Sequence, residues 1–315
     1  MPSPVELLSS QLLTEKDIRL YVKRDDLIHP ALSGNKWRKL KYNLLQARQN
    51  QQKVLLTFGG AYSNHIYAVA AAGKLFNFNT VGIIRGERPL ELGSTLKFAE
   101  SQGMYLHFIS REDYRKKTNA VFLEGLKKSF GSFYNIPEGG TNQLALKGVQ
   151  EVISELDVQI PENKIICTAC GTGGTAAGLI KHILQDRKDD LDSDTKDKTN
   201  CKNQVIGFPA LKNASWMYED INRLLYGNIS TGAADKWSLK LDYHFGGYAK
   251  YTQELISFIA DFKNEFNIQL EQVYTAKMFY GLFDLIKQDY FTAGTNIVAI
   301  HTGGLQGLLK ELKAD

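Results

Sequence analysis

Short apolar runs alternate with longer amphipathic segments along most of the chain. Six runs rich in β-branched and apolar residues have the length of β-strands, and they cover residues 53–58, 80–84, 105–109, 164–167, 205–208 and 296–300. Several of them are apolar at every position, which indicates strands that are covered on both faces. Strands of this kind, alternating with helices, predict an α/β fold in which helices pack on mostly parallel sheets.

Two of the intervening segments space their apolar residues three or four positions apart, as on one face of a helix. These residues are Trp37, Leu40, Leu44 and Ala47 in one segment and Leu146, Val149, Ile153 and Leu156 in the other. We expect both sets in the core. The stretch 186–203 is dense in Asp and Lys and nearly free of large apolar residues. It predicts an exposed loop or a frayed helix end, to which we assign no function.

Composition narrows the class of protein. The 315 residues suffice for two domains or one large α/β unit, and 43% hydrophobic with 23% charged residues is ordinary for a soluble protein. No apolar run is long enough to span a membrane, and residues 1–6 lack the basic and apolar regions of a secretion signal. A net charge of +4 without a basic stripe between aromatics argues against nucleic acid as a partner. We therefore expect a cytoplasmic protein that binds small molecules.

Cysteine usage points to structure rather than chemistry. Three cysteines are too few for a disulfide scaffold. Cys167 and Cys170 form a C-x-x-C pair, but both lie in an apolar strand-like run with no second pair of ligands. We favour a structural role for them and predict no metal site.

The segment from Ser33 to Lys39 leads directly into a predicted helix. Gly34 allows a close approach of the backbone, Lys36 falls in the first turn, and Lys39 lies three residues later on the same face. A helix start favours anions, which hints that Lys36 serves as an amine nucleophile with a lowered pKa. Most helix lysines are solvated surface groups, so this segment alone leaves both interpretations open.

Two glycine-containing segments follow predicted strands. In 58–65 the glycines turn the chain and Ser63 can cap the next helix, whose free N–H groups suit a carboxylate or phosphate. In 170–178 several glycines and threonines precede a helix, which predicts a phosphate-binding loop. It has neither the Gly-Lys-Ser/Thr end of a Walker loop nor an acidic ribose partner. A simple cap in the first segment and a generic turn in the second are the alternatives.

Further motifs accompany these three segments. The full set covers residues 22–26, 34–40, 63–65, 136–140, 171–175, 273–278 and 301–304. Its order and spacing closely resemble the pyridoxal-phosphate enzymes of the family that contains 1-aminocyclopropane-1-carboxylate deaminase and D-cysteine desulfhydrase. The resemblance spans nearly the whole chain.

The resemblance implies pyridoxal phosphate as the cofactor, held as a Schiff base on Lys36, which would also move protons at the substrate carbon. It implies that Lys39 and the loop 171–175 hold the phosphate, that Asn64 bonds the ring hydroxyl, and that Thr302 faces the pyridine nitrogen. The loop consists of Gly171, Thr172, Gly173, Gly174 and Thr175.

The same resemblance assigns the substrate side of the site. Ser63 would meet the substrate carboxylate and take part in proton transfer, within a substrate-binding segment that continues through Asn64 and His65. Tyr248 and Tyr274 match the two active-site tyrosines of the family. The expected substrate is a small amino acid.

The implied fold is that of the tryptophan synthase β subunit, with two domains that each have a central, mostly parallel sheet. The cofactor domain would comprise residues 1–41 and 138–315, and a smaller α/β domain would be inserted at 42–137. The site would lie between the domains. Members of the family are usually homodimers, and we expect the same here.

Three departures from the family pattern bear on the substrate. Thr275 and Thr302 stand where the deaminases carry Glu and Leu, which favours a desulfhydrase that releases pyruvate, ammonia and sulfide from D-cysteine. Ring opening of aminocyclopropane carboxylate to 2-oxobutanoate and ammonia is the alternative, and an inactive ligand-sensing relative is another. Tyr67 replaces the usual arginine, which raises the hypothesis that it narrows the pocket.

Overall fold

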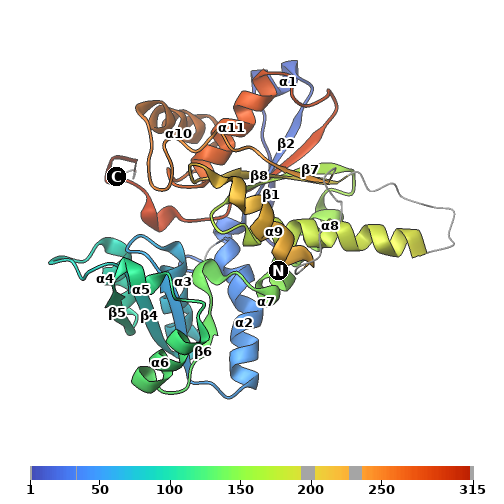
Figure 1. Ribbon diagram of the computed structural model, residues 1–315. Coiled ribbons are helices and arrows are strands. Elements are labelled where there is room, and N and C mark those ends of the chain that lie inside the picture. Colours follow the sequence, from blue (N-terminus) through green and yellow to red (C-terminus); the bar gives the residue numbers. More distant parts are fainter. Residues whose placement is uncertain (1, 33, 193–202, 227–235, 313–315) are drawn as a thin grey trace.

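Two mostly parallel sheets make up the framework of the protein (Figure 1). The computed structural model describes residues 2–32, 34–192, 203–226 and 236–312, with only the backbone for 186–192 and residue 310. The larger sheet has the order β1 (Val5–Leu7), β2 (Arg19–Lys23), β10 (Asn296–Ile300), β7 (Lys164–Cys170), β8 (Gln204–Pro209), β9 (Trp237–Leu239). The smaller sheet has the order β5 (Met104–Ile109), β4 (Asn79–Arg85), β3 (Val54–Gly59), β6 (Tyr134–Ile136).

Every strand pair in both sheets is parallel except the edge pair of β1 and β2. The predicted α/β fold with two mostly parallel sheets is therefore confirmed. All six predicted strands are present, as β3, β4, β5, β7, β8 and β10. The sequence interpretation missed four others, β1, β2, β6 and β9. Of these β2 is internal, paired between β1 and β10.

Helices cover both faces of each sheet (Figure 1). Their bounds are α1 (Gln11–Glu15), α2 (Asn35–Gln49), α3 (Asn64–Phe76), α4 (Ser94–Ser101), α5 (Arg111–Tyr114), α6 (Ala120–Phe130), α7 (Gln143–Gln159), α8 (Gly174–Asp192), α9 (Met217–Tyr226), α10 (Gln253–Phe266) and α11 (Thr275–Lys287). The two predicted helices correspond to α2 and α7. The polar stretch 186–203 begins in the last turns of α8, and its residues 193–202 lie outside the described residues.

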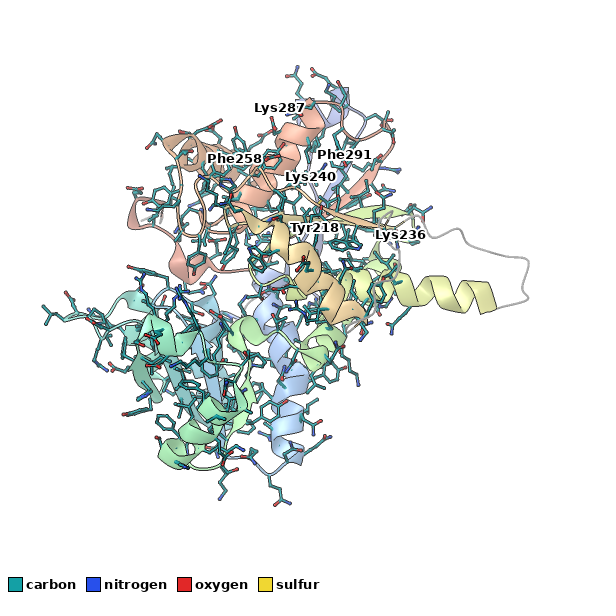
Figure 2. The ribbon with its side chains drawn as sticks, in the orientation of Figure 1. Tyr218, Lys236, Lys240, Phe258, Lys287 and Phe291 are labelled. Carbon is teal, nitrogen blue, oxygen red and sulfur yellow. The ribbon has the colours of Figure 1, made fainter. Side chains whose placement is uncertain are left out.

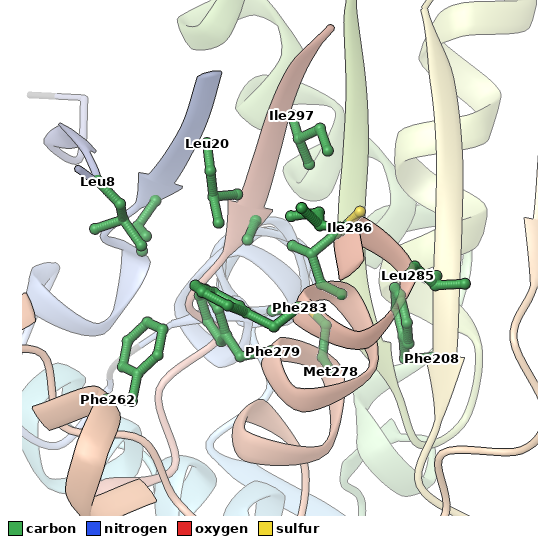
Figure 3. Packing of buried hydrophobic residues seen from close by; sticks show 14 of the residues in the cluster. Leu8, Leu20, Phe208, Phe262, Met278, Phe279, Phe283, Leu285, Ile286 and Ile297 are labelled. Carbon is green, nitrogen blue, oxygen red and sulfur yellow. The ribbon is translucent and has the colours of Figure 1, made fainter. Parts of the chain in front are cut away.

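The core of the larger sheet is divided by the alternation of side chains along its strands. In β10, Ile297 and Ala299 face the cluster formed with α10 and α11, whereas Val298 and Ile300 face the cluster formed with α7 and α8. Figure 3 shows the first cluster, where Phe262 of α10 lies beside α11. Apolar strands with both faces covered explain why these runs lack polar positions.

Side chains fill the space between sheets and helices throughout the molecule, and Phe258 and Tyr218 mark α10 and α9 in Figure 2. The strands of the smaller sheet and the helices between them occupy residues 54–136, within the insert expected at 42–137. The expected boundary at 41–42 falls inside the continuous helix α2. Leu40, Leu44 and Ala47 of this helix pack in the core of the smaller sheet. Among the described residues, no helix is both long and apolar enough to cross a membrane.

Buried ion pairs fix the orientation of α2, which carries both candidate lysines. The guanidinium of Arg38 bonds the carboxylate of Asp25 at 2.7 Å and that of Glu155 on α7 at 2.8 Å. Because Arg38 lies between Lys36 and Lys39, this anchor also sets the direction in which the two amines project.

Candidate active site

A cavity of about 360 Å³ opens where the carboxyl ends of the two sheets face each other. It is bounded by the end of β4, by the segments that follow β3, β6, β7, β8 and β10, and by the first turns of α2, α3 and α8. Parallel α/β sheets bind ligands at this edge, and the volume is in the range of small-molecule sites. All the site residues predicted from the sequence line it: Lys36, Lys39, Ser63, Asn64, His65, Gly171, Thr172, Gly173, Gly174, Thr175, Tyr248, Tyr274 and Thr302.

The loop after β7 forms an anion cup at the start of α8. A Cβ built on Gly174 would lie 2.6 Å from Thr141 Oγ1, and the hydroxyls of Thr141 and Thr172 are 2.7 Å apart. Glycine is therefore required for the loop to pass this threonine pair. The amide of Asn35 donates to Thr175 Oγ1 at 3.0 Å, which ties the cup to α2. N–H groups at a helix start, together with its dipole, suit a phosphate.

Lys36 and Lys39 present two amines to the same space. The Lys36 Nζ donates to Asn35 Oδ1 at 2.7 Å, and burial lowers its pKa to about 8 against the opposing effect of Glu271. Lys39 Nζ lies 3.2 Å from the carbonyl oxygen of Gly139. Burial and the charge of Lys36 lower the pKa of Lys39 to about 7. An anion beside Lys39 would reverse this shift, as expected of a phosphate-binding lysine.

The first turn of α3 offers donors on the opposite wall. Ser63 is the N-cap residue predicted from the sequence, and its Oγ accepts the N–H of Ile66 at 3.2 Å. Because that contact uses an oxygen lone pair, the hydroxyl proton of Ser63 is left for a ligand. Among the described residues, no acceptor bonds the N–H groups of Asn64 and His65. The turn can therefore bind a carboxylate.

The imidazole of His65 has a structural role. It is 2% exposed, and its Nε2 lies 2.8 Å from the hydroxyl of Thr57. That hydroxyl donates to the carbonyl of Ile136 at 2.8 Å, so it accepts from Nε2–H and fixes the tautomer. Burial lowers the pKa of His65 well below its usual value, which keeps the ring neutral. Any contribution of His65 to substrate binding therefore comes from its main-chain N–H group.

Asn64 is oriented by a residue near the C-terminus. Gln306 Nε2 donates to Asn64 Oδ1 at 2.8 Å. The contact occupies the carbonyl of the Asn64 side chain and leaves the amide N–H₂ as the group that can bond a ligand hydroxyl or its anion.

Tyr248 and Tyr274 close the cavity from the side of the larger sheet. Their ring centroids are 6.1 Å apart at an interplanar angle of 62°, and each phenol influences the pKa of the other. Burial raises the pKa of both hydroxyls, that of Tyr274 well above its usual value. Both phenols are thus protonated at neutral pH and can donate hydrogen bonds.

The wall formed by Thr302 is neutral. Thr302 is 8% exposed and lines the cavity, and the only carboxylate among the lining residues is that of Glu138. Tyr114 donates to this carboxylate at 2.8 Å and Lys117 pairs with it at 3.3 Å. Glu271 does not line the cavity, because its oxygens accept main-chain N–H groups at the start of α11.

Two residues that the sequence related to substrate choice lie away from the cavity. Thr275 does not line the cavity: its side chain is fully buried, and its hydroxyl contacts Glu271 within the first turn of α11. Tyr67 does not line the cavity either, because its ring stacks on that of Phe98 in α4. The two ring centroids are 3.7 Å apart, and the interplanar angle is 12°. The hypothesis that Tyr67 narrows the pocket is wrong.

The two strand cysteines are buried thiols of β7 without a disulfide. Burial raises the pKa of Cys170 to about 12 and that of Cys167 further, so both are poor nucleophiles. These observations agree with a structural role. In the parts of the chain that the structure describes, no cluster of three His, Cys, Asp or Glu side chains could hold a metal ion.

The sequence interpretation missed several residues that line the cavity. Arg85 ends β4, and its guanidinium lies 5.6 Å from the ring centroid of Tyr114. Asn35, Gly60 and Glu138 also line the cavity; they lie in segments that the sequence singled out, but no role was assigned to them. One signal could have identified Arg85: it is a charged residue at the carboxyl end of a strand run that was otherwise apolar, at the edge where such sheets bind ligands.

The donors around the cavity fit pyridoxal phosphate. The cup at α8 and Lys39 would hold its phosphate, and the amine of Lys36 would bind its aldehyde carbon. The amide of Asn64 would bond the ring hydroxyl, and the hydroxyl of Thr302 would face the ring nitrogen. All of these groups line the same cavity.

Comparisons with known proteins agree with this fit. The family model described as "Pyridoxal-phosphate dependent enzyme" matches residues 2–303. A relative from Arabidopsis thaliana, a mitochondrial bifunctional D-cysteine desulfhydrase/1-aminocyclopropane-1-carboxylate deaminase, is 32% identical over 307 residues, which cover 92% of this chain and 73% of the relative. The D-cysteine desulfhydrase of Salmonella typhi is 27% identical, covering 98% of this chain and 93% of that protein.

A solved structure of an ACC deaminase homologue superposes with a TM-score of 0.80 at 27% identity, covering 98% of this chain and 90% of that one. Fold, cavity and sequence similarity therefore lead to one conclusion. The chain belongs to the family of pyridoxal-phosphate dependent enzymes, among relatives named 1-aminocyclopropane-1-carboxylate deaminase and D-cysteine desulfhydrase, and pyridoxal phosphate is its cofactor.

Proposed function

We propose that this enzyme catalyses β-elimination from a small amino acid, with D-cysteine as the preferred substrate and pyruvate, ammonia and sulfide as products. The neutral cavity wall at Thr302 carries this proposal. A hydroxyl partner leaves the cofactor's ring nitrogen less positive than a carboxylate would. A weaker electron sink favours rapid loss of a leaving group over a long-lived carbanion.

Lys36 is the proposed base. When bound, pyridoxal phosphate supplies an electron-accepting ring for negative charge at the substrate Cα. The pKa of Lys36 at about 8 leaves part of the amine neutral near neutral pH, so the amine can accept the Cα proton. The hydrogen bond to Asn35 orients the amine at the base of the cavity.

The first turn of α3 is the proposed site of the substrate carboxylate. The hydroxyl of Ser63 and the N–H groups of Asn64 and His65 converge there, and the dipole of a 13-residue helix adds to their effect. This arrangement fixes the substrate while Lys36 removes the proton.

The paired phenols of Tyr248 and Tyr274 are the proposed donors to the leaving sulfur. Both are protonated because burial raises the pKa of their hydroxyls. In the elimination the Cα–H bond breaks with its proton passing to Lys36, a Cα=Cβ double bond forms, and the Cβ–S bond breaks with its electron pair on sulfur, which leaves as hydrosulfide. The released enamine becomes an imine, which water hydrolyses to pyruvate and ammonia. Hydrogen bonds from the two phenols would stabilise that developing charge.

The test is a panel of D- and L-cysteine, D- and L-serine, and 1-aminocyclopropane-1-carboxylate, assayed separately for keto acid and sulfide. We expect the highest kcat/KM for D-cysteine, with equal yields of sulfide and pyruvate. Faster formation of 2-oxobutanoate from the cyclopropane amino acid would assign deaminase activity instead. Cofactor binding without turnover of any member would support a ligand-sensing relative. The homodimer is a prediction from the family resemblance, and the cytoplasmic location is a prediction from the sequence.

A further inference from the structure

Lys277 of α11 carries a buried charge that the proposed chemistry does not use. The side chain is 1% exposed, and it is absent from the cavity wall. No carboxylate bonds it within the described residues. Its Nζ donates instead to the main-chain carbonyls of His244 at 2.8 Å, Gly247 at 2.8 Å and Ala210 at 3.5 Å. Burial of an ammonium is costly unless such dipoles compensate it.

The segment that Lys277 bonds has an unusual backbone. Four residues between positions 245 and 249 have positive φ, with 50° at Phe245, 88° at Gly246, 116° at Gly247 and 56° at Ala249. Residues other than glycine rarely adopt a positive φ. Phe245 and Ala249 therefore hold strained backbone conformations that the surrounding structure must enforce. The ammonium of Lys277 is one such constraint, because it donates hydrogen bonds to the carbonyl oxygens of His244 and Gly247 in this turn.

Each segment that Lys277 joins also supplies a residue to the cavity. Gly247 directly precedes Tyr248, and Ala210 directly precedes Leu211, both of which line the cavity. Lys277 also lies three residues after Tyr274, the N-cap residue of its own helix, which lines the cavity. One ammonium thus connects three parts of a single cavity wall.

We propose that Lys277 is a positioning residue, which holds the turn 244–249 so that the phenol of Tyr248 meets that of Tyr274. Its effect on turnover rests on the proposed function, because it acts through Tyr248. The effect of Lys277 on the order of the turn is independent of the proposed function.

Lys164 provides a matched control. It is also a buried lysine, 3% exposed, and its Nζ donates to Asp157 at 2.9 Å. It lies at the start of β7, away from the carboxyl edge, and does not line the cavity. Lys277→Met and Lys164→Met both remove a buried charge, but only the first releases the turn. Lys277→Gln, which keeps an amide donor, replaces the methionine variant if that protein does not fold.

The first experiment needs no substrate. Hydrogen–deuterium exchange of the cofactor-loaded protein should show residues 244–250 exchanging about tenfold faster or more in Lys277→Met, since loss of the anchor opens the turn locally. The N–H groups of Gly246, Gly247 and Lys250 are the reporters, because they bond within the turn. Lys164→Met should leave this segment unchanged. Unchanged exchange in Lys277→Met would overturn the proposal.

The second experiment is a double-mutant cycle with Tyr248→Phe. Lys277→Met should lower kcat for the best substrate by roughly tenfold or more, at unchanged cofactor affinity. In the Tyr248→Phe background the same substitution should lower kcat by less than about twofold, because the effects of residues that act as one unit are not additive. Lys277→Gln should recover part of kcat. Fully additive losses would mean that Lys277 acts otherwise than through Tyr248. If the substrate panel shows no turnover, the proposed function fails while the exchange experiment still decides the role of Lys277.

Discussion

Gly34 packs directly against the carbonyl oxygen of Thr302. A Cβ built on Gly34 would lie 1.8 Å from that oxygen, and the backbone at Gly34 has a φ of +65°. This contact brings the start of α2 against the segment after β10. It sets the position of the Lys36 amine relative to the Thr302 hydroxyl, which come from opposite ends of the chain.

Substitution of Gly34 by Ala should therefore damage the site more than the fold. We expect cofactor affinity to fall by roughly tenfold or more, because the methyl group must displace Thr302 or shift a backbone conformation with ψ of −147° that is essentially restricted to glycine. Gly131→Ala is the control, since Gly131 has a φ of +72° with no atom within 4 Å of the added Cβ. It should lower the free energy of unfolding with little change in cofactor affinity. Cofactor titration and urea unfolding of both variants measure the two effects, and equal affinities would contradict the expectation.

Lys36→Ala should bind the cofactor only noncovalently. Borohydride reduction followed by peptide mass spectrometry should find the cofactor on Lys36 in the wild type and on no lysine in the variant, because Lys36 is the amine proposed to bind the aldehyde carbon, whereas Lys39 is proposed to hold the phosphate. Lys41→Ala is the control on the same helix, where Lys41 pairs with Glu151 at 2.6 Å at the surface. A single alternative lysine labelled in Lys36→Ala would show the assignment to be wrong.

Anion binding by the cofactor-free protein should weaken as the pH rises. Lys39 has a pKa of about 7 rather than 10.5, so its ammonium is present at pH 6 and largely lost at pH 9. Sulfate, whose charge is constant over this range, should therefore bind most tightly at pH 6, with an affinity that falls by up to about tenfold per pH unit above 7. Calorimetric titration at several pH values measures this, and Lys39→Met should leave only the weaker dependence from Lys36. A flat profile in the wild type would argue against Lys39 as the anion ligand.

The lowered pKa of Lys39 also makes the free energy of unfolding depend on pH. Between about pH 7 and 10.5 the unfolded chain holds the Lys39 proton and the folded chain does not. The contribution of Lys39 to the free energy of unfolding therefore grows as the pH rises through this window and is lost as the pH falls toward 7. Urea unfolding of the cofactor-free wild type and Lys39→Met across this range should show the difference.

Introducing the deaminase-type carboxylate at position 275 should destabilise the protein rather than change its substrate. Thr275 is fully buried against the carboxylate of Glu271, so Thr275→Glu would place two carboxylates together. We expect a loss of roughly 3 kcal/mol or more in the free energy of unfolding, as for an uncompensated buried charge. The double variant Thr275→Glu/Glu271→Gln should recover part of it. Urea unfolding of the three proteins tests this, and a fully stable single variant would contradict it.

Local sequence by itself determined much of this protein. The apolar runs predicted six of its strands because strands buried on both faces need apolar residues throughout. The cap at Ser63, the first-turn position of Lys36 and the glycine loop before α8 follow from short-range backbone chemistry. The family resemblance supplied the roles, and the residues it named do gather around one cavity.

The tertiary structure alone decided what each side chain faces. Thr275 and Tyr67 lie near active-site motifs in the sequence, but packing turns the first toward Glu271 and the second toward Phe98. The sequence assigned no role to Lys277. Only the tertiary structure places the carbonyl groups of His244 and Gly247 next to its ammonium. Spacing along the chain fixes the face of an element on which a residue lies. The partner of that face comes from a distant segment, and only the packing of that segment determines it.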